Sequence, residues 1–250
     1  DIGARAVAQN LADLEAMGAD VLGVVAAVSV PTTTDAAWVR ALSAGMRAEC
    51  ARAGATLLGG DLSSSPHISI AVTALGDLRG RAPVRRGGAR PGDVVAVKGR
   101  LGWSAAGLFV LTRGFKSPRA VVSAYRVPEV PYGEGRRAAE AGATSLIDVS
   151  DGLLADLGHI AEASGVGICI SSEALEVPDP LQAVAATTGS SPLRFVLTGG
   201  EDHALVGTFD QVDVPSDWAI IGRVAEGSGV LVDDEEWDLE EGTGYAHFQR

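Results

Sequence analysis

Four aspartates lie where short polar motifs interrupt apolar sequence, and their side chains are of a type that could hold a metal ion. They are Asp13, Asp61, Asp148 and Asp151. Mg²⁺ takes carboxylate oxygens from proteins and completes its coordination with water and phosphate oxygens. The histidines are scattered without zinc-ligand spacing, and the sequence contains no Walker loop or cysteine-based nucleophile motif. The residue types therefore indicate a magnesium-dependent phosphate site.

The hexapeptide IDVSDG at 147–152 is the most informative of these motifs. The two-residue period of a strand places Asp148 and Ser150 on the same face, and Asp151 follows where a helix should begin. Two carboxylates and a hydroxyl would then converge at one end of the strand. The alternative is that Asp151 only caps the helix and Asp148 only ends a strand at the surface, because aspartate is a favoured cap residue. Spacing alone leaves both interpretations open.

The other two aspartates have weaker sequence contexts. Asp61 follows Gly59 and Gly60 at the predicted end of a strand, where backbone could approach a phosphate closely, although Gly-Gly-Asp is also an ordinary turn. Asp13 lies in the middle of a predicted helix between apolar neighbours, which is a costly place for an unpaired carboxylate. It is either a ligand or a residue that faces solvent.

Further polar candidates lie in two glycine-rich segments. Arg86 could bind a phosphate with two hydrogen bonds, but Arg85 is an equal rival on spacing and either side chain could simply be exposed. Glu201 and Asp202 follow a predicted strand at 195–197, where an acidic hairpin tip would give the same sequence.

Composition limits the classes of function. The 250 residues carry 20 basic and 32 acidic side chains, a net charge of −12, which argues against a nucleic-acid surface and an anionic membrane surface. No stretch of about 18 uninterrupted apolar residues is present. Cys50 and Cys169 lie in apolar periodic segments, as expected for reduced, buried thiols in the cytoplasm. We expect a cytoplasmic α/β protein with neither a nucleic-acid nor a membrane partner.

Hydrophobic periodicity predicts the elements that must position these residues. Helical spacing begins at Ile2, which suggests that the natural chain has residues upstream. The predicted helices cover 2–18, 35–51, 102–112, 136–141 and 152–163. The predicted strands cover 21–30, 55–58, 67–75, 94–97, 145–149, 167–170, 195–197, 203–208, 219–224 and 229–232. Residues 76–92 are rich in Gly, Pro and Arg and read as a loop, which makes this segment the best candidate for a domain boundary.

Five motifs, taken in order, resemble the thiamine-monophosphate kinase family over nearly the whole chain. They are NLADLEAMGA, LLGGD, RRGGARPGD, IDVSDGLLADLGHI and LTGGEDHAL. The resemblance implies an α/β (α+β) fold of two domains, shared with aminoimidazole ribonucleotide synthetase. Residues 1–85 would form an N-terminal domain whose mixed sheet makes the interface of a homodimer, and residues 86–250 a C-terminal α/β domain.

The resemblance also implies a reaction and its site. ATP would phosphorylate thiamine phosphate to thiamine diphosphate by direct, Mg²⁺-assisted, in-line transfer, with no covalent enzyme intermediate and no dedicated catalytic base. The implied magnesium ligands are Asp13, Asp61, Asp148 and Asp151. The implied ATP contacts are Gly60, Asp61, Arg86 and Ser150, and the implied substrate contacts are Glu201, Asp202 and Tyr245, the last as a stacking aromatic.

Two departures from the family pattern keep alternatives open. The family usually has a segment before this first helix, with a Gly-Asp-Asp motif and a histidine-containing stretch, so we expect either upstream residues or a truncated form. The family motif Gly-Glu-Asp-Tyr-Glu-Leu reads GEDHAL at 200–205 here. The alternatives are another ATP-dependent enzyme of the same superfamily and a non-catalytic nucleotide-binding or dimerisation module.

Overall fold

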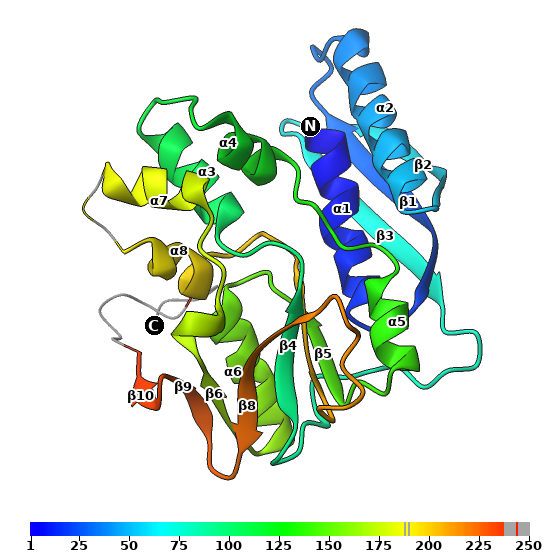
Figure 1. Ribbon diagram of the computed structural model, residues 1–250. Helices are drawn as coiled ribbons and strands as arrows, with labels where there is room; N and C mark the ends of the chain where they lie inside the picture. The colour runs from blue at the N-terminus through cyan, green and yellow to red at the C-terminus, as the bar shows by residue number, and fades with distance from the viewer. Residues whose placement is uncertain (188, 190, 238–243, 245–250) are drawn as a thin grey trace.

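The chain folds around two β-sheets, as a computed structural model shows for residues 1–187, 189, 191–237 and 244 (Figure 1). The first sheet has the strand order β2-β1-β3, in which β1 is parallel to β2 and antiparallel to β3. Its strands are β1 (Asp20–Val30), β2 (Thr56–Ser64) and β3 (Ser69–Asp77). Helices α1 (Ile2–Glu15) and α2 (Ala36–Arg52) pack on one face of this sheet. Asp35 caps α2, because its side chain accepts a hydrogen bond from the backbone N–H of Ala37 at 2.7 Å.

The core of this first unit follows from the alternation of strand β1. Val24, Ala26 and Val28 are buried against Leu11 of α1 and Leu42 of α2. The residues between them point to the opposite face, which no helix of the described chain covers. One side of the sheet is therefore packed, and the other is exposed.

The second sheet is larger and mixed, with the strand order β10-β9-β6-β8-β4-β7-β5. Its strands are β4 (Val94–Lys98), β5 (Ser145–Asp148), β6 (Gly167–Ile170), β7 (Leu205–Phe209), β8 (Ala219–Ala225), β9 (Gly229–Val232) and β10 (Glu235–Glu236). The associated helices are α3 (Trp103–Thr112), α4 (Arg119–Arg126), α5 (Glu134–Glu140), α6 (Leu153–Ser164), α7 (Asp179–Ala186) and α8 (Pro192–Thr198), with a 3₁₀ turn at Ser172–Ala174. Buried leucines of α6 pack with residues of β5, β6 and β7 in the main core.

Helix α1 links the two units, because its C-terminal end packs beside α5 and the end of β5 (Figure 1). Tyr132, in the segment before α5, donates a hydrogen bond from its hydroxyl to Oε1 of Glu49 in α2 at 2.7 Å. The boundary predicted between residues 85 and 86 lies in the connection between β3 and β4. No helix among the described residues combines the length and the hydropathy needed to span a bilayer.

The prediction that a strand ends at residue 58 is wrong, because β2 continues through Gly59, Gly60 and Asp61 to Ser64. A register shift between Val24 and Val25 of β1 leaves Leu58 without a partner in the pairing, which marks a bulge immediately before Gly59. A Cβ on Gly60 would lie 1.9 Å from the carbonyl oxygen of Ala26. The second glycine therefore permits close strand packing inside the sheet.

The prediction of a strand at 195–197 is also wrong, because these residues belong to helix α8. Pro192 occupies the first turn of this helix, where its fixed φ suits the helical backbone and its missing N–H costs nothing. A run of only three apolar residues cannot distinguish a strand from a helix. Helices α4 and α7 were not predicted individually either.

Candidate functional site

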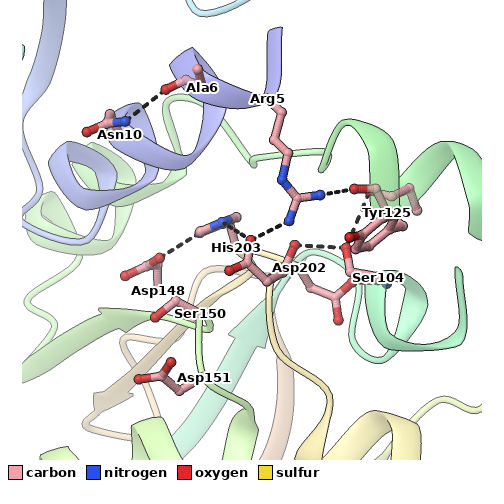
Figure 2. A network of polar contacts seen from close by, with 12 residues as sticks. Arg5, Ala6, Asn10, Ser104, Tyr125, Asp148, Ser150, Asp151, Asp202 and His203 are labelled. Atoms are coloured by element: carbon pink, nitrogen blue, oxygen red, sulfur yellow. Dashed lines mark hydrogen bonds and ion pairs between the residues drawn. The ribbon is translucent and has the colours of Figure 1, made fainter. Parts of the chain in front are cut away.

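The ends of β5 and β7 bring together Asp148 and a histidine that the sequence analysis did not select. Asp148, the last residue of β5, pairs with Leu205 at the start of β7 and is only 5% exposed. Its Oδ2 atom lies 2.9 Å from Nδ1 of His203, which is equally buried (Figure 2). The available signal for His203 was that it replaces the tyrosine of the GEDYEL motif.

Helix α1 and the loop before β4 add Asp13 and Arg86 to this group. The Asp13 side chain is exposed on α1, but the surrounding protein partly desolvates it and so raises its pKa. The negative charge of Asp148 raises this pKa further, while the positive charges of His203 and Arg86 act in the opposite direction. Asp13, Asp148 and Arg86 therefore share one electrostatic environment. Arg85 borders a different hollow, together with Ala139 and Thr144. The structure thus distinguishes two arginines that spacing could not.

The negative charge of Asp148 raises the pKa of Asp13, and a cation would stabilise two carboxylates placed in this way. Asp13 and Asp148 supply only hard oxygen ligands, which is the donor chemistry that Mg²⁺ prefers. The residues present therefore fit a magnesium ion. Asp61 lies on another element, exposed in strand β2 of the first sheet beside Gly60, opposite Ala27 and Ala26 of β1.

Asp156, which the sequence analysis did not select, shapes the loop that carries Ser150 and Asp151. Oδ2 of Asp156 accepts hydrogen bonds from the backbone N–H groups of Ser150, Asp151 and Gly152, at 3.0, 3.0 and 3.1 Å. Asp156 is 1% exposed, and burial raises its pKa to about 7, although the N–H groups of Asp151 and Gly152 favour the charged form. Gly152 has a φ of +127°, and a Cβ there would lie 2.7 Å from the carbonyl oxygen of Thr198. This loop is therefore fixed on both sides.

Asp151, Asp156 and His159 form another group that has ligand atoms within 4.8 Å of one another. Asp156 already uses one oxygen to accept the three loop N–H groups. We therefore interpret its main role as holding Asp151 in place. The signal for this role was an acidic side chain in the first turn of a helix, where it can reach free N–H groups.

The loop lines a cavity of about 520 Å³ between α1, α3, α4 and the segment after α8. Its polar lining includes Arg5, Tyr125, Ser150, Asp151 and Glu201, and Gly244 also contributes to its wall. The Arg5 guanidinium lies 4.8 Å from the centre of the Tyr125 ring (Figure 2). It also forms an ion pair with Glu201. The cavity therefore presents a cation, an aromatic ring and carboxylates within one space.

The two acidic residues predicted at the substrate side have different positions. Glu201 is exposed to the cavity, whereas Asp202 is 4% exposed and accepts hydrogen bonds from the backbone N–H groups of Gly102 and Ser104, the latter at 2.7 Å. Burial raises the pKa of Asp202 to about 7, opposed by these N–H groups and by His203. Asp202 therefore anchors its loop to the start of α3. Tyr245 lies outside the described residues.

Comparison with known proteins identifies the family. The model for "AIR synthase related protein, N-terminal domain" matches residues 1–78, and that for the corresponding C-terminal domain matches residues 90–234. The thiamine-monophosphate kinase of Mycobacterium tuberculosis H37Rv is 51% identical over the whole chain, which spans 74% of that protein. The Corynebacterium glutamicum enzyme of the same name is 40% identical over 90% of the chain and 70% of that protein.

Solved structures agree with this assignment. The thiamine monophosphate kinase of Aquifex aeolicus superimposes with a TM-score of 0.89 at 31% identity, over 94% of this chain and 81% of that one. AaThiL complexed with AMPPCP and TMP superimposes with a TM-score of 0.88, also at 31% identity, over 99% and 80% of the two chains. With its two-sheet fold, its site and these relatives, the chain belongs to the thiamine-monophosphate kinase family.

Proposed function

We propose that this protein transfers the γ-phosphoryl group of ATP to thiamine phosphate and releases thiamine diphosphate and ADP. The observation that carries the proposal is the 51% identity over the entire chain to a thiamine-monophosphate kinase. The site supports it, because Ser150 and Asp151, just after β5, line the cavity. The AaThiL structure holds an ATP analogue and TMP, which are ligands of the same two classes.

We assign the acceptor substrate to the cavity that Arg5 and Glu201 border. Thiamine phosphate carries a cationic thiazolium ring and an anionic phosphate, and the cavity contains groups of both charges and the Tyr125 ring. Glu201 is placed to face the cationic part of the substrate. Asp202 supports this wall through α3 rather than by contact, and Tyr245 stays the predicted stacking partner.

The remaining assignments concern ATP and the metal. Asp13, Asp61, Asp148 and Asp151 would hold Mg²⁺, and Gly60, Asp61, Arg86 and Ser150 would contact ATP. When bound, Mg²⁺ neutralises phosphate charge as the phosphoryl group moves. Arg86 adds a fixed positive charge near Asp13. Asp156 and Asp202 hold the two loops in place, so the site is organised before the substrates bind.

The reaction needs no covalent intermediate on the protein. A terminal oxygen of thiamine phosphate attacks the γ-phosphorus, the new P–O bond forms, and the bond between that phosphorus and the β–γ bridging oxygen breaks, so that ADP leaves. A phosphate oxygen is already nucleophilic, and no base is required to activate it. Catalysis therefore consists of alignment and electrostatic stabilisation.

Turnover of the purified 250-residue chain tests the function. The chain is incubated with ATP, Mg²⁺ and thiamine phosphate, and thiamine diphosphate and ADP are separated and quantified by chromatography. We expect equal amounts of the two products, and no phosphorylation when thiamine replaces thiamine phosphate. ADP without thiamine diphosphate would contradict the acceptor, and absence of both would favour the non-catalytic alternative.

We also propose a homodimer that covers the exposed face of the first sheet. Large apolar side chains of its strands are exposed: Leu22, Val25, Leu58 and Leu75, at 39% to 55%. Exposed apolar side chains gathered on one sheet typically mark an interface. Cys50 and Cys169 are free and buried, which supports a cytoplasmic location for the enzyme.

A further inference from the structure

His203 is buried between the proposed metal site and the proposed substrate cavity. Its Nδ1 atom lies 2.9 Å from Oδ2 of Asp148 (Figure 2). Its Nε2 atom lies 3.9 Å from Oε2 of Glu201. A carboxylate only accepts hydrogen bonds, so Nδ1 carries a proton and its N–H donates a hydrogen bond to Asp148. One imidazole ring therefore connects residues that the proposed mechanism gives separate roles.

The backbone holds His203 in an unusual conformation. Its φ is +53° and that of Glu201 is +67°, in a region that residues other than glycine seldom adopt. The N–H groups of these residues bond to the carbonyl oxygens of Val149 and Ser150, at 2.9 and 2.8 Å. Asp202, between them, is fixed to α3. Strain that is maintained by several contacts is concentrated at functional sites.

Nε2 of His203 gives a second indication that packing alone does not explain this residue. Among the described residues, this buried nitrogen has no hydrogen-bond partner. A buried polar atom without a partner costs about 1–3 kcal/mol of stability. An apolar side chain would avoid that cost but could not donate to Asp148.

We infer that His203 is a positioning residue of the phosphotransfer site, and that its Nδ1–H fixes the orientation of the Asp148 carboxylate toward the bound cation. The inference rests on the proposed function. Partners that orient a ligating side chain typically change metal affinity or activity by about 10- to 100-fold when they are removed. His203 acts through Asp148 and needs no contact with the reacting atoms.

Two amide substitutions separate this role from simple packing. In His203→Asn the amide nitrogen is attached to Cγ, as Nδ1 is in histidine, and asparagine tolerates a positive φ. In His203→Gln the amide nitrogen lies one bond further out, near the position of Nε2. The affinity of each protein for Mn²⁺ alone is measured by electron paramagnetic resonance, together with kcat, the KM for ATP and the thermal midpoint.

We expect His203→Gln to weaken Mn²⁺ binding by about 10-fold or more and to lower kcat. We expect His203→Asn to keep most of the wild-type Mn²⁺ affinity and most of the wild-type kcat. Equal Mn²⁺ affinities for the two variants would overturn the inference, whatever their thermal midpoints. In an Asp148→Asn background, His203→Gln should add no further loss. An additional, independent loss there would show that His203 does not act through Asp148. Failure of the wild-type chain to make thiamine diphosphate would refute the function and leave the Mn²⁺ comparison valid.

Discussion

Glu15, the last residue of α1, accepts a hydrogen bond from the backbone N–H of Gly135 in α5 at 2.9 Å, across the junction between the two sheets. Its other oxygen accepts the N–H of Gly133, also at 2.9 Å. Glu15 is 2% exposed. This buried carboxylate therefore satisfies free N–H groups at the beginning of α5 and joins the two halves of the chain.

Replacing Glu15 by Ala should destabilise the protein by about 2 to 4 kcal/mol, because two buried N–H groups lose their acceptor. Glu15→Gln keeps one acceptor oxygen and should fall between Ala and wild type. Urea unfolding measures these differences. Glu140→Ala is the matched control, since this glutamate is exposed and makes only surface ion pairs. Equal losses for Glu15→Ala and Glu140→Ala would contradict the role of Glu15.

Asp148→Asn should lower kcat by at least about 100-fold, because it removes a charge that the site uses to bind the cation. The thermal midpoint should change little, since the amide is nearly the same size as the carboxylate. Steady-state turnover over a range of Mg²⁺ concentrations measures the effect. Asp213→Asn is a control on an exposed loop beyond the opposite end of β7. Normal turnover of Asp148→Asn at saturating Mg²⁺ would exclude the ligand assignment.

Arg86→Ala should reduce kcat/KM for ATP by about 10- to 100-fold, the usual effect of losing a charge-assisted hydrogen bond to phosphate. Arg85→Ala should leave this value close to wild type. The two substitutions remove the same groups from adjacent residues, and only Arg86 lies in the electrostatic environment of Asp13. Initial rates at varied ATP concentration compare them. A larger defect in Arg85→Ala would reverse the assignment.

Much of the fold could be predicted because its elements have clear local patterns. Strand β1 is a nearly continuous apolar run, and helix α2 begins after an aspartate that caps it, so neither requires knowledge of a distant neighbour. Strand β2 was cut short because Gly60 serves a tertiary contact with Ala26. A glycine pair in isolation resembles a turn, and only the pairing with β1 shows that the strand continues through it, beyond a bulge at Leu58.

The candidate site also contains residues that the sequence could predict and residues whose roles appear only in the folded structure. Asp148, Ser150 and Asp151 are contained in one short motif, which can be read directly. The roles of Asp156 and His203 depend on which backbone groups and side chains meet them after folding. Asp202 is a further case that the sequence alone could not resolve. Its local sequence resembles the acidic tip of a hairpin, but its oxygens accept hydrogen bonds from N–H groups at the start of α3, about 100 residues away in the chain.

Val25→Lys should convert a dimer into monomers, since it places a charge in the exposed apolar face of the first sheet. The exposed fraction of Val25 is 39%, whereas Val212, on a loop away from this sheet, is 87% exposed. Val212→Lys is therefore the matched control and should leave the assembly unchanged. Sedimentation velocity gives the molecular mass of each protein. A wild-type chain that stays monomeric at high concentration, or a dimer that tolerates Val25→Lys, would contradict the proposed interface.

Stability should depend on pH through Asp202. Burial raises its pKa from 3.8 to about 7 in the folded protein, so the folded state binds the proton more tightly than the unfolded state. The protonated Asp202 side chain contributes its full stabilisation below the pKa that it has in the unfolded chain, and this contribution is lost as the pH rises through about 7. The loss between pH 4 and pH 8 is at most about 4 kcal/mol. Asp202→Asn cannot titrate, and it keeps one oxygen for the N–H groups of α3. Urea unfolding at several pH values should therefore show wild type losing stability relative to Asp202→Asn as the pH rises, and parallel curves for the two proteins would contradict a raised pKa at Asp202.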